Sequence, residues 1–171
     1  MLHRIGDVAL PPHAGPGGFD HAAVHRRTGL VSVAHTANDA LDVIDGATGT
    51  LVESIGGLPA VAGALVSDEH DLVFTSNRGE NTIGLFEAAA PAKITKIGVG
   101  VRPNGLAYDP ARRRLLAANV GDPAVPGSYT VSLVDLDSRG VTEVPVPGRT
   151  RWTVHDPAAV AAVPSAGPHG L

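Results

Sequence analysis

Three things are scarce in this chain of 171 residues, and each absence excludes a class of protein. There is no cysteine, so disulfides and thiolate chemistry are excluded. Aromatic residues make up only 4%, so the core must consist mainly of Val, Leu, Ile and Ala. No apolar run approaches the ~20 residues of a membrane helix, and residues 1–7 lack an apolar stretch of signal-peptide length. We therefore expect a cytoplasmic protein without a membrane partner.

Strong basic character is also missing. The formal net charge is −4, and the one basic run, Arg112 to Arg114, falls between two expected strands, where a solvated turn is its ordinary role. Nucleic acid is therefore not an expected partner. Gly (21), Pro (14) and hydrophobic residues (43%) are abundant. This composition predicts one folded domain made of many short elements joined by turns.

A repeat of 42 residues organises the chain. A β-rich segment ends at His35, and similar segments end at Asn77 and Asn119, so each copy is offset from the previous one by 42 residues. A second β-rich segment follows each of them, at 40–45, 82–87 and 130–135. Turn signals separate short strands, and no segment has a sustained 3.6-residue apolar period. Each unit therefore reads as four short β-strands.

Four strands in about 42 residues are typical of a β-propeller blade. A single twisted sheet cannot bury both of its faces, whereas blades stacked face to face can. The sequence thus predicts an all-β partial propeller over residues 1–157. Its expected parts are an outer strand at 2–11, complete blades at about 19–58, 61–100 and 102–148, and the start of a fourth blade at 150–157. Residues 158–171 show no second-strand pattern and are expected to form a flexible tail.

The repeat resembles the YVTN-type (YncE-like) β-propeller family. Asn77 and Asn119 each close a β-rich strand, and the strands that follow read Thr-Ile-Gly-Leu-Phe-Glu and Thr-Val-Ser-Leu-Val-Asp. The family consensus has a Tyr-Val-Thr-Asn strand followed by a Thr-Val-Ser-Val-Ile-Asp strand. The resemblance covers roughly residues 19–157, although the first copy has His35 in place of Asn and no copy keeps the Tyr. It implies a propeller but no particular activity, because most members are uncharacterised.

Three complete blades cannot close a ring, since closed propellers have about four to eight. The chain is therefore expected to be a truncated product, one half of a dimer, or an open arc. We favour truncation, because two copies would leave two blades incomplete. In each case, open blade faces and edges favour self-association.

One end of the predicted blades gathers polar residues around the central channel. The expected starts of the inner strands are His21, Gly63, Asn104 and Arg151, and Asp20 is expected to point to the opposite face. The second strands end at this rim, and loop 120–129 belongs to it. The candidate ligand-binding residues are His21, His35, Asn77, Arg102, Asn104, Asn119, Arg151 and Trp152.

Each candidate also has a structural alternative. Asn77, Asn119 and His35 can hydrogen-bond their own turns, and Trp152 can pack into the next blade. Arg102 and Arg151 suit a carboxylate or phosphate because the guanidinium is forked, although a salt bridge is the alternative for Arg102. For His21, a ligand role and a structural role stay open.

Motifs for catalysis are absent from the sequence: there is no His-Glu-x-x-His zinc pattern, no Gly-x-Ser-x-Gly turn and no phosphate-binding loop. No metal or other cofactor is expected. The leading interpretation is a non-enzymatic binding or interaction module for an unknown small molecule or protein. The alternative is a lactonase-like hydrolase acting on a sugar lactone at the channel. Metal-free propeller lactonases use His and Arg, which His21 and Arg151 could match.

Overall fold

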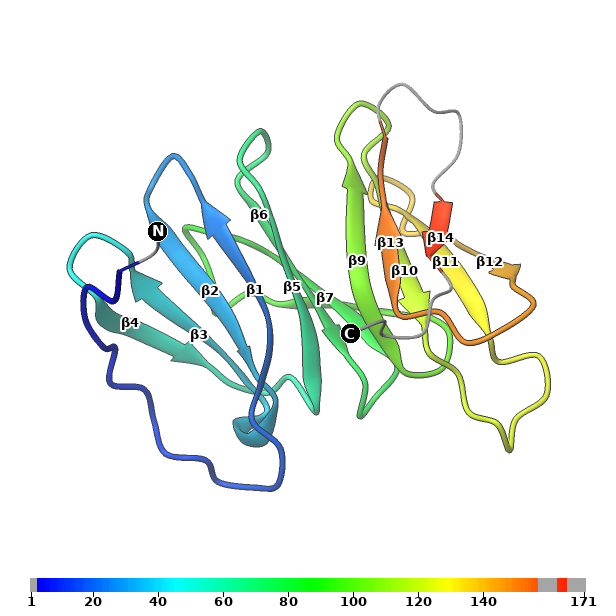
Figure 1. Ribbon diagram of the computed structural model, residues 1–171. Coiled ribbons are helices and arrows are strands. Elements are labelled where there is room, and N and C mark those ends of the chain that lie inside the picture. The colour runs from blue at the N-terminus through cyan, green and yellow to red at the C-terminus, as the bar shows by residue number, and fades with distance from the viewer. Residues whose placement is uncertain (1–2, 157–162, 166–171) are drawn as a thin grey trace.

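The computed structural model describes residues 3–156 and 163–165. Within these ranges the chain forms fourteen strands and one short 3-10 turn, η1 (Thr36–Asn38). No helix in the described part is long and apolar enough to cross a membrane. The expected all-β fold is confirmed (Figure 1).

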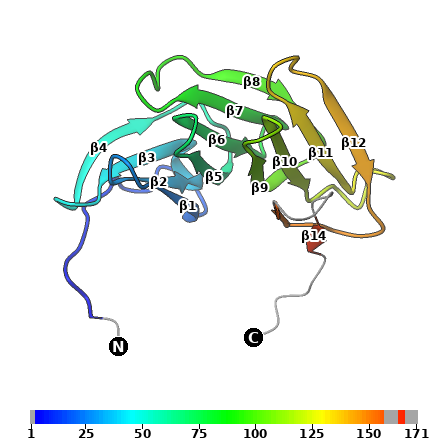
Figure 2. The same ribbon diagram turned by 90° about the horizontal axis from the view of Figure 1, so that it is seen from above.

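Three antiparallel sheets of four strands each match the three predicted blades. The first blade is β1 (Phe19–His25), β2 (Leu30–His35), β3 (Ala40–Asp45) and β4 (Thr50–Ile55). The second is β5 (Val61–Ser67), β6 (Leu72–Asn77), β7 (Thr82–Glu87) and β8 (Thr95–Gly98). The third is β9 (Pro103–Asp109), β10 (Arg114–Asn119), β11 (Thr130–Asp135) and β12 (Val141–Pro145). In each blade the spatial order follows the chain. Figure 2 shows the blades in an arc, with β1, β5 and β9 inside and β4, β8 and β12 outside.

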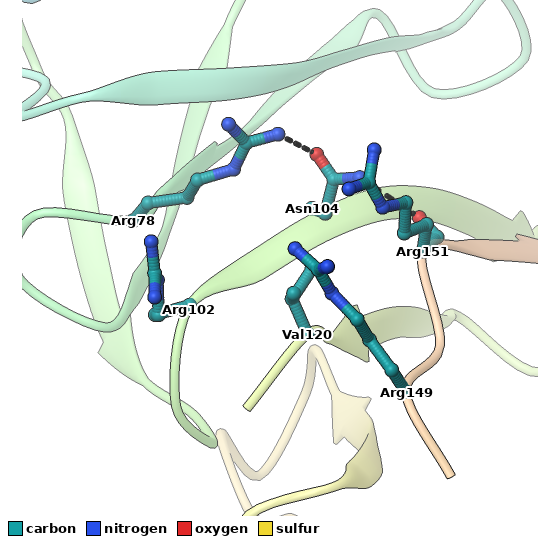
Figure 3. Close-up of a pocket in the computed structure, with 6 residues that line it drawn as sticks. All are labelled: Arg78, Arg102, Asn104, Val120, Arg149 and Arg151. Atoms are coloured by element: carbon teal, nitrogen blue, oxygen red, sulfur yellow. Dashed lines mark hydrogen bonds between the residues drawn. The ribbon is translucent and has the colours of Figure 1, made fainter. Parts of the chain in front are cut away.

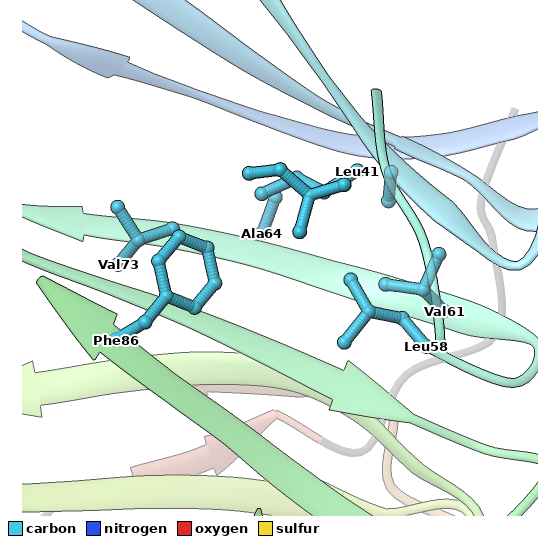
Figure 4. Close-up of a cluster of buried hydrophobic side chains, with 8 residues drawn as sticks. Leu41, Leu58, Val61, Ala64, Val73 and Phe86 are labelled. Carbon is cyan, nitrogen blue, oxygen red and sulfur yellow. The ribbon is translucent and has the colours of Figure 1, made fainter. Parts of the chain in front are cut away.

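Apolar side chains fill the spaces between consecutive blades. Between the first and second blades, Leu41 and Ile55 meet Val61, Val73 and Phe86 (Figure 4). A second cluster joins the second and third blades through Phe74, Ile83, Ile97, Leu115, Ala117 and Val134. Each sheet thus buries a face that it could not bury alone. Aliphatic residues dominate both clusters, as the low aromatic content predicts.

Repeated left-handed turns connect the blades at the channel end. Ala60 and Arg102, each just before an inner strand, have φ of 48° and 56°. The backbone N–H of Ala60 donates to Asp39 Oδ1 (2.7 Å), and that of Arg102 donates to Asn81 Oδ1 (2.9 Å). The acceptors lie in the loop between the second and third strands of the preceding blade. These bonds fix the two kinds of loop side by side, which builds the channel rim.

The predicted outer strand over residues 2–11 does not form: within 3–18 no strand precedes Phe19. A strand needs a neighbour to satisfy its backbone groups, and no described strand pairs with this segment. The segment is instead fastened near its end by Asn38. The Asn38 amide donates to the Pro12 carbonyl (3.0 Å), and the Ala14 N–H donates to Asn38 Oδ1 (2.7 Å).

The fourth blade begins as predicted and goes further than predicted. β13 (Trp152–Val154) pairs antiparallel with β14 (Val163–Ser165). The sequence prediction of a tail without a second strand is therefore wrong at residues 163–165, and the rest of 158–171 lies outside the described residues. The sequence did not indicate β14 because it has only three residues and one of them is a proline. A proline is nevertheless tolerated in an edge strand.

Candidate binding site at the channel rim

The start of each inner strand is placed by its pairing with the end of the second strand. Phe19 pairs with His35, Val61 with Asn77 and Pro103 with Asn119. The next residues along the three inner strands are Asp20, Ala62 and Asn104. These three residues therefore occupy equivalent places in the three blades.

The sequence prediction of these positions was shifted by one residue. It grouped His21 and Gly63 with Asn104, and it placed Asp20 on the opposite face. The pairing makes His21 and Gly63 equivalent to Gly105 instead. A shift of one residue exchanges the two faces of a strand. The inner strands of all three blades have an irregular register near this end, which the sequence pattern does not reveal.

Four arginines gather around a small cavity at this rim (Figure 3). The cavity measures about 70 Å³, and we call it the arginine cavity; it is lined by Arg78, Arg102, Asn104, Val120, Arg149 and Arg151. Arg78 follows β6, Arg102 precedes β9, Val120 follows β10, and the last two arginines precede β13. The lining therefore comes from three consecutive blades. Val120 is the part of the predicted loop 120–129 that lines the cavity.

A chain of polar contacts fixes one side of the cavity. Arg78 Nη2 donates to Asp20 Oδ2 at 2.8 Å and also to Asn104 Oδ1. The buried Asn104 amide donates in turn to the Arg151 carbonyl at 3.1 Å. Burial acts to raise the pKa of Asp20, but the hydrogen bond with His21 and the positive charge of Arg78 outweigh it and hold that pKa below its ordinary value. Asp20 is thus a carboxylate that orients Arg78.

Arg102 and Arg149 form the other side of the cavity, and both residues are exposed. Neither guanidinium makes an ion pair or hydrogen bond with any described residue. The salt bridge considered for Arg102 is therefore not found in the described part of the chain. Two forked cationic groups remain turned to the same small space, an arrangement that suits an oxyanion.

His21 and Trp152 meet beside the cavity, although neither lines it. Their ring centroids are 4.4 Å apart at an interplanar angle of 61°. His21 Nδ1 lies 2.9 Å from the Ala62 carbonyl and 2.8 Å from Asp20 Oδ1, and its Nε2 is buried with no partner among the described residues. Trp152 thus packs against the first blade while 43% of it stays exposed.

His35, Asn77 and Asn119 are fully buried and lie outside the cavity lining. Each of their side chains reaches the third strand of its own blade. His35 Nδ1 is 2.7 Å from Asp42 Oδ2, and Asn77 Nδ2 donates to Thr82 Oγ1 at 3.0 Å. Asn119 Nδ2 donates to Thr130 Oγ1 and Ser132 Oγ, both at 2.8 Å. These contacts are structural, but their partners are side chains of the third strand rather than the turns that the sequence suggested.

Sequence reasoning missed Arg78 and Arg149. Arg78 directly follows Asn77 and is carried into the rim by the end of β6. Arg149 stands two residues before Arg151, just as Arg102 stands two residues before Asn104. An alignment of the fourth inner strand on the third would have shown Arg149. Across residues 3–156 and 163–165, no cluster of three His, Asp or Glu suits a metal ion.

Neither a protein-family model nor a curated protein sequence matches the chain. Solved structures do match it. Hydrazine synthase of Kuenenia stuttgartiensis is 12% identical with a TM-score of 0.72, and the match covers 91% of this chain and 43% of that one. Virginiamycin B lyase from Staphylococcus aureus is 14% identical with a TM-score of 0.64, covering 80% and 45%. A chain of the nidogen–laminin complex is 11% identical with a TM-score of 0.67, covering 82% and 53%.

These matches bear on the fold alone, because sequence identity is low. The present chain spans about half the length of the solved chains it resembles, as the coverages of 43%, 45% and 53% show. The matched structures are β-propeller proteins. The chain therefore has the β-propeller fold, in the form of an open arc of three complete blades and part of a fourth.

Proposed function

We propose that this chain is a propeller binding module of the YVTN type that holds a small molecule at the arginine cavity. This proposal rests on one observation: three consecutive blades converge on one cavity, and the side chains of Arg102 and Arg149 that line it form no hydrogen bond or ion pair with any described residue. Binding sites are concave places where a few polar groups converge. A cavity of about 70 Å³ has room for one small polar group of a ligand.

A bulky substitution at the cavity tests this proposal. We expect Arg149→Trp to abolish the binding of any small molecule found by a thermal-shift screen, because the indole fills the mouth of the cavity. Arg26→Trp is the matched control, since Arg26 is exposed in the β1–β2 turn at the other end of the blade. Ligands that bind both variants equally, or a screen without ligands, would count against the proposal.

A lactonase-like hydrolase is the second candidate. The observation that favours it is the 2.8 Å contact between Asp20 and His21, which would orient the imidazole of a general base. The burial of His21 Nε2 beside Trp152 speaks against it. We expect no hydrolysis of gluconolactone above the buffer rate in a pH-stat assay. If the wild type hydrolysed gluconolactone and His21→Gln did not, the chain would be a hydrolase, and the proposal of a binding module would be wrong.

We further propose that the functional ring is longer than this chain, so that another blade covers the free face of the first blade. Val24, Val66 and Tyr108 occupy equivalent positions, pairing with Val31, Val73 and Leu115. Val66 and Tyr108 pack against the blade before them, whereas Val24 is 53% exposed. The coverage of about half of the matched solved chains supports the same proposal.

Light scattering after size exclusion should therefore reveal polydisperse, concentration-dependent association of the isolated chain. The open apolar face would recruit neighbouring copies without closing a ring. Val24→Ser should reduce the association, whereas Val125→Ser, at a residue 48% exposed in the 120–129 loop, should not. A monodisperse dimer would contradict the proposal, because two copies would then complete the ring.

A further inference from the structure

We infer that the group held in the arginine cavity is an oxyanion with at least two negative charges, such as a phosphate or a pair of carboxylates. The inference rests on the proposed function, because it names the ligand chemistry of the same cavity. It depends on three features of the lining: its charge, the fixed orientation of one guanidinium, and the presence of alanines in the second blade at the places of Arg102 and Asn104.

The charge of the lining is of one sign. Its members are four arginines, an amide and a valine, with no carboxylate among them. The chain as a whole carries −4, so this cluster does not follow from a generally basic surface. Asp20 lies beside the cavity and is engaged by Arg78 and His21. Guanidinium groups that share a small, partly enclosed space repel one another, and a polyanion between them would remove that repulsion.

The orientation of Arg78 is set before a ligand arrives. Its Nη2 donates to both Asp20 and Asn104, and the Asn104 amide in turn donates to the Arg151 carbonyl just before β13. Fixing a side chain in advance reduces the entropy lost on binding. Arg102 and Arg149 supply guanidinium groups without a carboxylate in the described structure. The cavity thus combines one prearranged donor with two cations available for charge neutralisation.

The turn and the strand start form in the second blade without the side chains of Arg102 and Asn104. Ala60 takes the same left-handed turn as Arg102, and Ala62 takes the same strand position as Asn104. The second blade therefore builds its inner strand with two alanines where the third blade uses an arginine and an asparagine. The left-handed turn at Arg102 therefore has a structural role, but the positive charge of its side chain does not. Binding of a polyanion would account for that charge.

Isothermal titration at low ionic strength tests the inference with four probes: pyrophosphate, citrate, acetate and glycerol. We expect pyrophosphate or citrate to bind at least about tenfold more tightly than acetate, and glycerol not to bind. Pyrophosphate binding without citrate binding would assign a phosphate, and the reverse would assign carboxylates. Added NaCl should weaken the interaction, because screening reduces the attraction between the charges.

Arg102→Gln and Arg149→Gln should each weaken binding of the polyanion about tenfold, the loss expected for one charge-assisted hydrogen bond. Both side chains are exposed, so both variants should fold, which circular dichroism will check. Arg26→Gln changes the net charge equally and should alter the affinity less than about twofold. Arg102→Lys keeps the positive charge but loses the forked guanidinium. Its affinity for the polyanion should therefore lie between those of the wild type and Arg102→Gln.

The outcomes separate this inference from the proposed function. Neutral ligands that bind the wild type, fail to bind Arg149→Trp and ignore salt would overturn the inference and leave the binding module standing. If Arg26→Gln and Arg149→Gln weakened polyanion binding equally, the inference would also be overturned. The affinity would then depend on the net charge of the protein rather than on the arginine cavity. If no ligand of either kind bound, both proposals would fail.

Discussion

Gly63→Ala should lower the free energy of unfolding by about 3 kcal/mol, the upper end of the cost of overpacking a core. A Cβ at this position would lie 2.5 Å from the Asn104 carbonyl oxygen, 2.6 Å from Ser76 Oγ and 3.1 Å from Leu106 Cδ1. The Gly63 N–H also donates to Ser76 Oγ (2.7 Å), which donates to the Asn104 carbonyl (2.6 Å). The methyl group would thus separate the inner strands of two blades and disturb a buried hydrogen-bond chain.

Gly98→Ala is the matched control in a urea titration. Gly98 ends β8, and a Cβ there would meet nothing within 4 Å. We expect no loss of stability and a gain of up to about 1 kcal/mol, since alanine restricts the unfolded chain more than glycine does. If Gly63→Ala and Gly98→Ala gave the same midpoint, the close approach of the inner strands at Gly63 would be wrong.

The fold was predictable because each repeat of the sequence corresponds to one blade. His35, Asn77 and Asn119 recur at a fixed offset, and each ends the second strand of its blade as the period predicts. The physical reason is that blades pack on one another in the same way, so similar patterns must recur. The predicted strand at 2–11 and the flexible tail were not confirmed in the described residues. The repeat has no full copy at either end, so its period gives no prediction there.

The site was predictable only in part, because its geometry depends on strand register. The sequence placed Arg102, Asn104 and Arg151 at the rim, and all three line the arginine cavity. It assigned Asp20 to the wrong face, since a local irregularity between Phe19 and Ala22 shifts the register by one residue. The sequence also places Gly63 among the starts of the inner strands at the rim, whereas its lack of a side chain allows the close approach of two blades.

The buried pair of His35 and Asp42 leads to the second large effect. Asp42→Ala should lower the free energy of unfolding by about 2–5 kcal/mol, because each buried polar group that loses its partner costs about 1–3 kcal/mol. Both residues are fully buried, with His35 Nδ1 2.7 Å from Asp42 Oδ2. Ser54 Oγ also donates to Asp42 Oδ1, so the substitution leaves two polar groups without their partner. Urea unfolding followed by circular dichroism measures the loss.

The third blade supplies a replacement for this pair. Asp42 and Ser132 occupy equivalent places on the third strands, and Asn119 contacts Ser132 as His35 contacts Asp42. The double variant His35→Asn with Asp42→Ser should therefore be more stable than the sum of its single variants predicts, with a coupling energy of about 1–3 kcal/mol. Additive losses would mean that the two blades do not use interchangeable pairs. A coupling of this size would mean that the residue at the end of the second strand and its partner on the third strand depend on each other. Asp42 would then compensate, within the first blade, for the presence of His35 where the other blades have Asn.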